Sequence, residues 1–431
     1  MVSRRDFIQQ SSILAAGAML AARHTAAASE RIRLGIIGTA NRGGQLMDAL
    51  APHGDAEMVA FCDVHGVALE RWRKEFPNAD FYGDYRRIIE RDDIDGVLIA
   101  TPDHWHAIQT VEACQAGKDV YIEKPLALKI AEGRRIVDVA KETKRVVQSG
   151  LHRRSSPFYK ELATEIQAGL IGKVTSAICY RVSNMTPDGI GHGTICDPPE
   201  DLDWDMWIGP QQMRPYQDNI TPYKFRWWKD YSSQLANWAV HYFDMIRWIL
   251  GEGAPISVVA IGGKYAVDDD RTIPDTMQAV FELSQGALLT FSHLEASNNQ
   301  LLSRPAEIEL RGTLGTLYVR GGSYEIIPER GGQFMDPALR MEPIKKAVDK
   351  EDFVDLTTAH MRNFLDCIKS RNRPNCDAEE AHISTIYAHL ANISLDTRLR
   401  LDWDQNTERI TNSTEANEGL QYTYREPWKL S

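Results

Sequence analysis

The sequence has no excess of positive charge and few cysteines. Its 49 Lys and Arg residues are outnumbered by 60 Asp and Glu residues, which gives a formal net charge of -11. This sign argues against a nucleic-acid partner and against binding to an anionic membrane surface. The 6 cysteines form no C-x-x-C pair, so neither a zinc ribbon nor a dense disulfide framework is indicated. A bridge between Cys367 and Cys376 is sterically conceivable, and the sequence does not decide whether it forms.

Long apolar runs are also missing. No segment approaches the roughly 20 consecutive apolar residues of a transmembrane helix. Residues 1–28 instead resemble a twin-arginine signal peptide, because the pair Arg4 and Arg5 is followed by the apolar run 13–22 and by the small residues 26–28. An amphipathic helix or an uncleaved anchor is the alternative. We therefore expect a protein exported to the periplasm, or otherwise out of the cytoplasm, with no membrane attachment after cleavage.

The remaining chain has the composition of a folded protein, with 43% hydrophobic and 25% charged residues. At roughly 150 residues per domain, 431 residues suggest two or three domains. Over residues 29–150, helical patterns alternate with short apolar runs, which lie at 32–37, 57–62, 96–100, 120–122 and 146–147. Repeated βα units give a mostly parallel sheet with helices on both faces. We predict a doubly wound Rossmann domain, whose ligands bind beyond the carboxyl ends of the strands.

Residues 151–431 show a different pattern. The β-like runs lie at 174–182, 256–265, 276–283, 287–293, 307–311 and 316–320. The turn at 284–286 reads as a hairpin, which makes its two strands antiparallel. Two helices, at about 355–369 and 377–395, precede a polar tail. This pattern predicts a C-terminal α/β domain with a largely antiparallel open sheet.

The first predicted strand ends in a glycine-rich turn. From Gly38 the chain reads G-x-A-x-x-G, with Ala40 where dinucleotide-binding turns often have a second glycine. Gly38 permits the tight turn, Gly43 permits close packing of the next helix, and the N-terminus of that helix offers N–H groups to a pyrophosphate. Asp63 follows Gly43 by 20 residues (63 − 43), where a carboxylate binds the adenosine ribose and repels the 2′-phosphate of NADP. The expected cofactor is NAD, with NADP less favoured; a strand-ending Asp chosen for its turn preference is the alternative.

Two more predicted strands end in polar motifs. Thr101-Pro102-Asp103-His104-Trp105-His106 follows one strand, and Glu123-Lys124-Pro125 follows the next. Both motifs should face the same crevice as the glycine-rich turn. Each has an ordinary interpretation as well, a helix start for the first and a solvated surface lysine for the second. We expect no metal at the His-x-His pair.

Taken together, these motifs resemble those of the Gfo/Idh/MocA oxidoreductase family, which includes glucose–fructose oxidoreductase and inositol dehydrogenase. The resemblance continues through residues 202–210, 225–228 and 237–244 and covers nearly all of the mature chain. It implies an NAD-binding Rossmann domain and a second domain that carries the substrate and often forms homo-oligomers through its sheet. The expected cofactor contacts are Gly38, Ala40, Asn41, Arg42, Gly43, Asp63, Thr101, Pro102, His104, His106, Glu123 and Lys124.

The segment 235–250 predicts a helix that presents Asn237, His241 and Asp244 on one face. Periodicity alone fits the solvated side of an amphipathic helix. In the family that the chain resembles, an Asp and a His four residues apart on this helix act beside the lysine of E-K-P. This likeness makes His241 the leading general acid/base and Lys124 its cationic partner, although a buried lysine with a lowered pKa could exchange roles with it. Asn237 stands where the family has Asp, and a neutral amide can orient groups but cannot relay a proton.

The sequence therefore predicts an NAD-dependent oxidoreductase that transfers a hydride from a hydroxyl-bearing carbon of a sugar, polyol or glycoside. Because a periplasm maintains no NAD pool, the cofactor should be retained and recycled in the site. A redox-neutral NAD-dependent glycosidase and a non-catalytic sugar- or dinucleotide-binding protein are the alternatives. The chain lacks the T-H-G-L-G-P-V stretch that we associate with exported N-acetylgalactosaminidases. The expected substrate contacts are Arg153, Tyr223, Arg226, Trp227 and Asp244.

Overall fold

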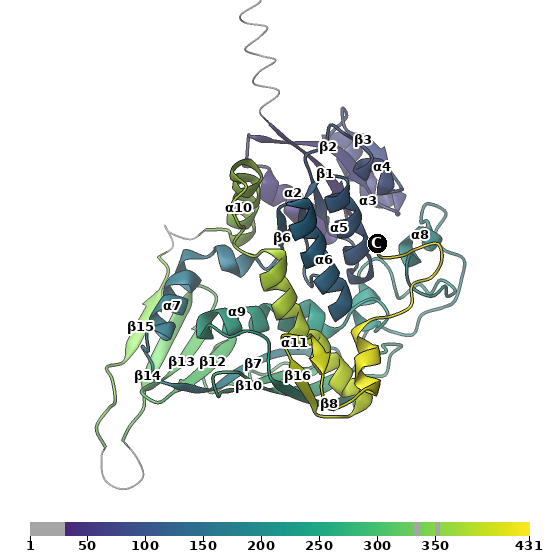
Figure 1. Ribbon diagram of the computed structural model, residues 1–431. Helices are drawn as coiled ribbons and strands as arrows, with labels where there is room; N and C mark the ends of the chain where they lie inside the picture. Colours follow the sequence, from purple (N-terminus) through teal and green to yellow (C-terminus); the bar gives the residue numbers. More distant parts are fainter. Residues whose placement is uncertain (1–30, 332–336, 350–353) are drawn as a thin grey trace, which may run out of the picture.

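Two β-sheets, each covered by helices, organise the chain in the computed structural model (Figure 1). The structure describes residues 31–331, 337–349 and 354–431, so the predicted signal peptide, including Arg4 and Arg5, lies outside the described residues. No helix in the described part of the chain is long and apolar enough to cross a membrane. These same ranges contain no group of three or more His, Cys, Asp or Glu side chains that could hold a metal ion.

The N-terminal sheet has six parallel strands in the order β3-β2-β1-β4-β5-β6. This order confirms the predicted doubly wound Rossmann sheet. The strand order reverses between β1 and β4, and ligands of such sheets bind at that point. The strands are β1 (Ile32–Ile37), β2 (Ala56–Cys62), β3 (Asp80–Tyr82), β4 (Gly96–Ile99), β5 (Asp119–Ile122) and β6 (Val147–Ser149). The helices are α2 (Asn41–Leu50), α3 (Gly66–Glu75), α4 (Arg86–Ile89), α5 (His106–Gln115) and α6 (Ile130–Thr143).

Two glycines determine the turn between β1 and α2. Gly38 has a φ of +85°, a backbone conformation that favours glycine, and a Cβ there would lie 2.8 Å from the backbone of Ala100. A Cβ on Gly43 would lie 2.1 Å from the carbonyl oxygen of Gly38. The two glycines therefore allow α2 to start directly against the end of β1.

The second sheet has eleven strands in the order β15-β14-β13-β12-β7-β10-β9-β8-β16-β17, with β11 paired to β7. The β7–β10 pair is parallel and the other pairs are antiparallel, which confirms the predicted largely antiparallel sheet. The predicted hairpin joins β9 to β10 through Gly286, whose φ is +87°. The strands are β7 (Val174–Asn184), β8 (Ser257–Gly263), β9 (Thr276–Glu282), β10 (Leu288–Leu294), β11 (Ala296–Ser297), β12 (Ile308–Gly312), β13 (Gly315–Arg320), β14 (Ser323–Pro328), β15 (Ile344–Ala347), β16 (Leu401–Asp404) and β17 (Arg409–Ile410).

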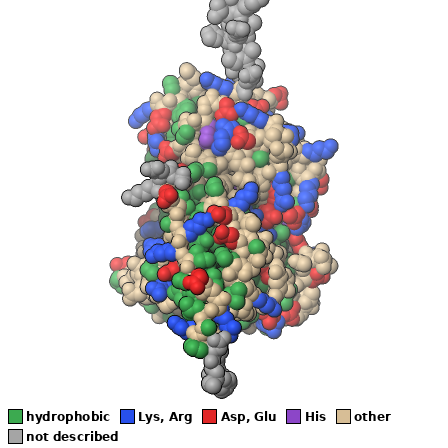
Figure 2. Space-filling model, turned by 90° about the vertical axis from the view of Figure 1, so that its left-hand side faces the viewer, with side chains coloured by type: hydrophobic (Ala, Val, Ile, Leu, Met, Phe, Trp, Pro, Cys, Tyr) green, Lys and Arg blue, Asp and Glu red, His purple; other side chains and the backbone are tan. Residues whose placement is uncertain are grey.

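Helices cover one face of this sheet (Figure 1). They are α7 (Pro157–Gln167), α9 (Val240–Leu250) and α11 (Ala378–Thr397). Phe243 of α9 and Tyr387 of α11 pack their rings on Phe281 of β9, at centroid distances of 5.1 and 5.3 Å. The opposite face is left partly uncovered, and Ile261 is 73% exposed there. Viewed from the side of β15 and α7, hydrophobic side chains lie among charged ones over the lower part of the molecule (Figure 2).

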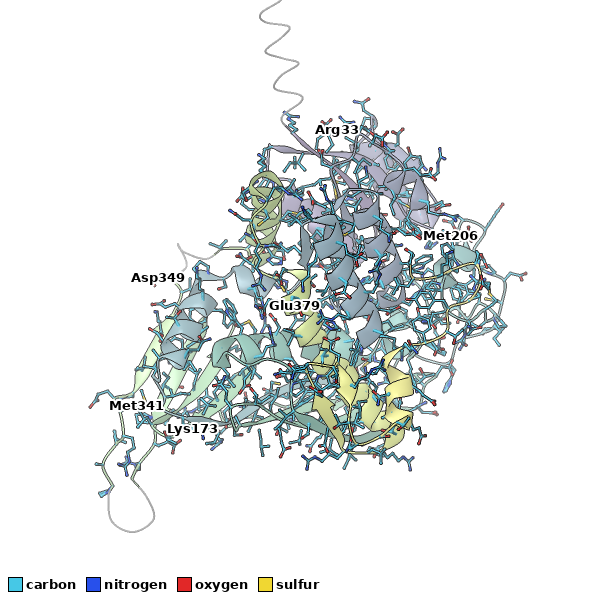
Figure 3. The ribbon with its side chains drawn as sticks, viewed as in Figure 1. Arg33, Lys173, Met206, Met341, Asp349 and Glu379 are labelled. Carbon is cyan, nitrogen blue, oxygen red and sulfur yellow. The ribbon has the colours of Figure 1, made fainter. Side chains whose placement is uncertain are left out.

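Several contacts join the two halves. Helix α10 (Leu356–Ser370) lies in the second half of the sequence, yet its Met361 and Phe364 are buried in the core of the N-terminal sheet. Met206 of the short helix α8 (Trp204–Ile208) packs against the other core cluster of that sheet, and Glu379 forms an ion pair with Arg134 of α6 at 2.9 Å (Figure 3). The two halves of the chain therefore pack against each other through buried side chains and an ion pair.

The polar tail expected after the last helix contains further strands and a short helix. Leu401 and Trp403 of β16 are buried, and the strand pairs with β8, so these apolar residues add an edge to the sheet. A 3-10 helix (Glu415–Leu420) follows. The chain then returns to the N-terminal domain, where Trp428 lies against the ring of Trp105 at a centroid distance of 4.8 Å.

All six cysteines are free thiols, and the Cys367–Cys376 bridge is not formed.

Candidate active site

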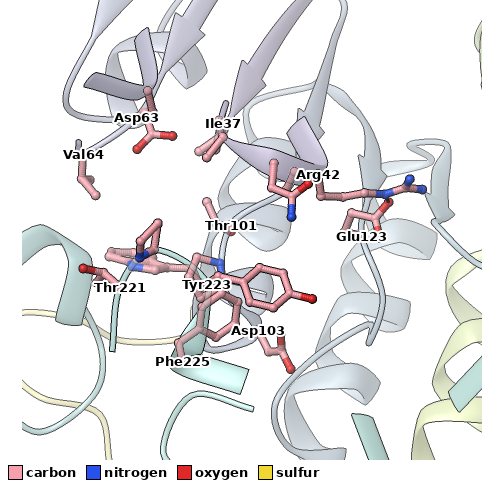
Figure 4. Close-up of a pocket in the computed structure, with 18 of the residues that line it drawn as sticks. Ile37, Arg42, Asp63, Val64, Thr101, Asp103, Glu123, Thr221, Tyr223 and Phe225 are labelled. Atoms are coloured by element: carbon pink, nitrogen blue, oxygen red, sulfur yellow. Dashed lines mark hydrogen bonds and ion pairs between the residues drawn. The ribbon is translucent and has the colours of Figure 1, made fainter. Parts of the chain in front are cut away.

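A pocket of about 530 Å³ lies between the carboxyl ends of the Rossmann strands and the second half of the chain (Figure 4). Residues that follow β1, β2, β4 and β5 line one side, and residues 202–241 line the other. This is the crevice in which the strand-end motifs were expected to meet. The predicted site residues that line it are Gly38, Ala40, Asn41, Arg42, Asp63, Thr101, Pro102, Glu123, Lys124, Tyr223, Arg226, Asn237 and His241.

The N-terminus of α2 opens into this pocket. No side chain caps it, and its first turn contains no acidic residue. Its first N–H groups are therefore available to an anion such as a pyrophosphate. This uncapped helix end, reached over the tight turn at Gly38, fits the cofactor that the glycine motif implies.

Asp63 lies at another edge of the pocket, directly after β2 (Figure 4). Its Oδ2 accepts a hydrogen bond from the Thr39 N–H at 2.8 Å, and its Oδ1 accepts one from the His65 N–H at 3.0 Å. Burial raises the pKa of Asp63, while these N–H donors oppose that change. The two N–H donors hold the carboxylate in place. Its remaining lone pairs can accept hydrogen bonds from ribose hydroxyl groups.

Lys124 follows β5 and is held by Asn237. Its Nζ donates to the backbone oxygen of Asn237 at 2.9 Å and to the side-chain Oδ1 at 3.0 Å. Burial lowers the pKa of Lys124 to about 8, although the negative charges of Glu123 and Asp103 oppose the change. The neighbouring Glu123 is occupied by Arg42, whose Nε lies 2.7 Å from its Oε1. Lys124 is thus a partly buried cation whose bonded partner is a neutral amide.

His241 lies at the start of α9 and lines the same pocket. Burial lowers its pKa well below the ordinary value, and the charges of Lys124 and His152 act in the same direction. The rings of His241 and His152 are 5.7 Å apart. A neutral imidazole in this position can accept a proton from a substrate hydroxyl.

The helix face predicted around His241 differs from the observed one. A single π-helical turn (Leu235–Ala239) precedes α9, so the residues before His241 do not follow α-helical spacing. Asn237 and His241 line the pocket as predicted, and the intervening Trp238 lines it as well. A wider turn of this kind is common at functional sites.

Asp244, which was expected to contact the substrate, does not line the pocket. It is buried, it pairs with Arg154 at 2.8 Å, and it accepts a hydrogen bond from Ser384 at 2.7 Å. Arg153 is also outside the lining and forms an ion pair with Glu307.

Four more predicted contacts lie behind the pocket wall. The indole N–H of Trp227 donates to Glu295. His104 bonds the carbonyl oxygen of Trp207 at 2.9 Å, and His106 bonds that of Pro125 at 2.7 Å. Gly43 packs against Gly38. None of the four is among the residues that line the pocket.

Sequence reasoning missed several polar residues of the pocket, and Asp103 and His152 are two of them. Asp103 belongs to the same motif as His104 and His106, and its carboxylate accepts a hydrogen bond from Ser232 at 2.5 Å. His152 follows β6, so the rule that ligands bind at strand ends would have found it.

Comparisons with known proteins agree with this architecture. Two sequence profiles of one family match the chain: "Oxidoreductase family, NAD-binding Rossmann fold" over residues 32–151, and "Oxidoreductase family, C-terminal alpha/beta domain" over residues 185–279 and 340–430. The myo-inositol 2-dehydrogenase of Thermotoga maritima is 23% identical over 376 residues, which are 85% of this chain and 97% of that protein. A glycosyl hydrolase family 109 protein of Shewanella sp. (strain W3-18-1) is 36% identical over 123 residues, which are 26% of this chain and 27% of that protein.

Solved structures share the fold at low identity. Levoglucosan dehydrogenase in complex with NADH and levoglucosan superimposes with a TM-score of 0.64 at 17% identity, covering 86% of this chain and 99% of that one. The WlbA dehydrogenase of Bordetella pertussis, in complex with NADH and UDP-GlcNAcA, gives a TM-score of 0.63 at 20% identity, covering 87% and 99%. The chain therefore belongs to the Gfo/Idh/MocA family of oxidoreductases, and its first domain is an NAD-binding Rossmann domain.

Proposed function

We propose that this protein is an NAD-dependent oxidoreductase that acts on a hydroxyl group of a sugar, polyol or glycoside. The observation that carries the proposal is the meeting of Lys124 and His241 in the pocket onto which the uncapped N-terminus of α2 opens. The 23% identical myo-inositol 2-dehydrogenase supports the substrate class.

Each polar group has a role in this reaction. NAD, when bound, supplies the hydride acceptor. His241 takes the proton of the substrate hydroxyl, and Lys124 stabilises the negative charge that develops on that oxygen. Asn237 holds the Lys124 ammonium through its two oxygens and leaves one N–H of that group for the substrate.

We also propose that the cofactor is NAD rather than NADP and that it stays bound through many turnovers. Asp63 supports the first part, because a fixed carboxylate after β2 repels a 2′-phosphate. The signal-like residues 1–28 support the second, because an exported enzyme has no maintained NAD pool. Replacing Arg4 and Arg5 by Lys should leave the precursor in the cytoplasm, and unchanged periplasmic protein after cell fractionation would contradict export by this route.

A redox-neutral glycosidase is the second candidate. The family 109 glycosyl hydrolases favour it at 33–36% identity, but each match covers about a quarter of this chain and of the relative. In that reaction, oxidation of a ring hydroxyl acidifies the neighbouring C–H, elimination releases the aglycone, and water addition with re-reduction restores NAD.

The deciding experiment mixes the purified protein, without added NAD, with free sugars and with glycosides, and follows the products by mass. Denaturing a second sample and chromatographing the supernatant identifies the bound dinucleotide. A pair of oxidised and reduced sugars supports the oxidoreductase, and released aglycone supports the glycosidase. If neither product forms, both proposed functions are contradicted.

Variants test the assigned residues in the same assay. His241→Ala and Lys124→Ala should each lower turnover by roughly 10²–10⁴-fold with NAD retained, because neither side chain is assigned to hold the dinucleotide. The exposed residues His192 and Lys345 provide matched controls, and their Ala variants should keep wild-type turnover. Near-wild-type turnover in His241→Ala would refute the assignment.

We further propose that the protein forms homo-oligomers through the uncovered face of the eleven-stranded sheet. Val259 and Ile261 of β8 and Leu288 of β10 are exposed on it, and apolar side chains gathered on one face are typical of interfaces. Light scattering coupled to size exclusion measures the mass, and Ile261→Glu should lower it to that of a monomer. A monomeric wild-type protein would contradict the proposal.

A further inference from the structure

Arg226 is a pocket arginine that forms no ion pair with a carboxylate in the described part of the chain. It lies on the 3-10 helix Lys224–Trp227 and lines the pocket. Its Nη1 donates to the carbonyl oxygen of Tyr223 at 3.0 Å, and its guanidinium lies 4.1 Å from the centroid of the Tyr223 ring and 4.5 Å from that of Phe225. Among the described residues, no Asp or Glu oxygen lies within 4.0 Å of the Arg226 guanidinium nitrogens, the distance that defines an ion pair. The two rings hold the cation in place without neutralising it.

The acids that line the pocket are engaged elsewhere. Glu123 pairs with Arg42 on one side of the pocket, while Asp63 accepts backbone N–H groups on another (Figure 4). Asp103 accepts the hydroxyl hydrogen of Ser232. The negative charge of Asp103 acts on Arg226, although the two side chains are farther apart than an ion pair.

Lys124 is the second pocket cation for which the described residues provide no bonded carboxylate. Its Nζ is held by the two oxygens of Asn237, which carry no net charge. Lys124 and Arg226 are close enough for their charges to repel each other. Two partly buried cations in one pocket are costly unless an anion compensates them. An anion that binds beside these two cations would therefore be favoured.

We propose that the substrate is an anionic sugar, one that carries a carboxylate or a phosphate group, and that Arg226 is the residue that selects it. A guanidinium offers parallel N–H groups to two oxygens of such an anion, and the contacts with the rings of Tyr223 and Phe225 hold it in position. Lys124 adds charge beside the reacting hydroxyl. This inference rests on the proposed function, since it names the substrate class of the same site.

Binding to the NAD-loaded protein tests the inference directly. Calorimetric titrations compare three hexuronates of gluco, galacto and manno configuration with their parent hexoses, and the corresponding hexose 6-phosphates with the same hexoses. At least one anionic member should bind about 10- to 100-fold more tightly than its neutral parent, the range for hydrogen bonds to a charged group. Tighter binding of a hexuronate than of its hexose identifies the anion as a carboxylate, and tighter binding of a hexose 6-phosphate identifies it as a phosphate.

Variants then assign the preference to Arg226. Arg226→Gln should abolish it with little change in the binding of the neutral sugar, while Arg226→Lys should keep part of it. Arg320→Gln, an exposed arginine at the end of β13, is the matched control and should bind as the wild type does.

Three results would overturn the inference: no preference for any anionic member, a preference that survives Arg226→Gln, or loss of bound NAD in Arg226→Gln. The third would assign Arg226 to the cofactor diphosphate. The absorbance of reduced nicotinamide, followed in the same mixtures, separates this outcome from a failure of the proposed function. Tight anion binding without NAD reduction would leave the anion site intact and refute the oxidoreductase assignment.

Discussion

Replacing Asn237 by Asp would place a carboxylate on the Lys124 ammonium. In the structure the Oδ1 of Asn237 is 3.0 Å from the Nζ of Lys124, while no hydrogen bond joins the described Asn237 and His241 side chains. The added charge should therefore act first on the lysine. Because a nearby negative charge favours the protonated form, we expect the variant to raise the pKa of Lys124 from about 8 towards its ordinary value.

The size of this change follows from the distance. Two unit charges 3.0 Å apart interact by about 5.5 kcal/mol at an effective dielectric constant of 20, which corresponds to about 4 pKa units. This is an upper bound, because burying a new carboxylate in the pocket costs free energy. Close charge pairs in proteins shift a pKa by about 1–3 units, and we expect a change in this range.

The assay is the pH dependence of bound NAD reduction in a single turnover, with the pH dependence of Lys124 methylation as a readout independent of activity. If the Lys124 cation assists the reaction, wild-type activity falls above about pH 8, and the variant should extend activity upward by 1–3 pH units. Asn237→Ala is the control, because it removes Oδ1 without adding charge and should not move the profile upward. An unchanged methylation profile in Asn237→Asp would refute the Lys124–Asn237 contact, and activity that rises through pH 8 in the wild type would refute the cationic role.

Three further predictions concern the cofactor, pH and the C-terminal tail. Asp63→Ala should weaken NAD retention by about 1–3 kcal/mol, measured by dialysis, and should reduce the preference of the protein for NAD over NADP. Burial raises the pKa of Glu132 to about 7, so the folded state binds its proton more tightly than the unfolded state, and this stability is lost as the pH rises from about 4.5 to 7. Glu132→Gln should therefore raise the free energy of unfolding in urea at pH 8 by up to about 3 kcal/mol and change it little at pH 4.5. Trp428→Ala should destabilise the protein by about 3–5 kcal/mol in thermal unfolding, since the buried ring packs on Trp105, and wild-type stability would contradict that packing role.

Much of the Rossmann domain could be predicted because its requirements are local. Gly38 and Gly43 are needed by a single turn, and the apolar run 32–37 is long enough to form a strand buried on both faces. The rule that ligands bind at strand ends then brought Asp63, Thr101 and Lys124 to one pocket although they are distant in the chain. Local chemistry and one topological rule were sufficient there.

Residue type alone could not decide which members of a motif face the pocket. His104 and His106 were expected there, yet both turn to backbone carbonyl oxygens, while Asp103 lines the cavity. Asp244 was expected on the face of His241, but Arg154, distant in the sequence, pairs with it. These outcomes depend on contacts with residues distant in the sequence, which the spacing of residues along a helix does not predict. The π-helical turn before His241 is another such case, since its wider spacing depends on how the surrounding elements hold it.

The burial of the pocket also bears on a choice that the sequence left open, whether Lys124 or His241 carries the positive charge. A lysine with a pKa of about 8 is protonated in roughly nine molecules of ten at pH 7, since one pKa unit corresponds to a factor of ten. The same burial lowers the pKa of His241 well below its ordinary value, and the Lys124 charge lowers it further. The two shifts act together, because keeping the lysine charged disfavours a second charge on the imidazole. At neutral pH this favours Lys124 as the cation and His241 as the base, and Asn237, which adds no negative charge, leaves that cation free to attract an anionic substrate.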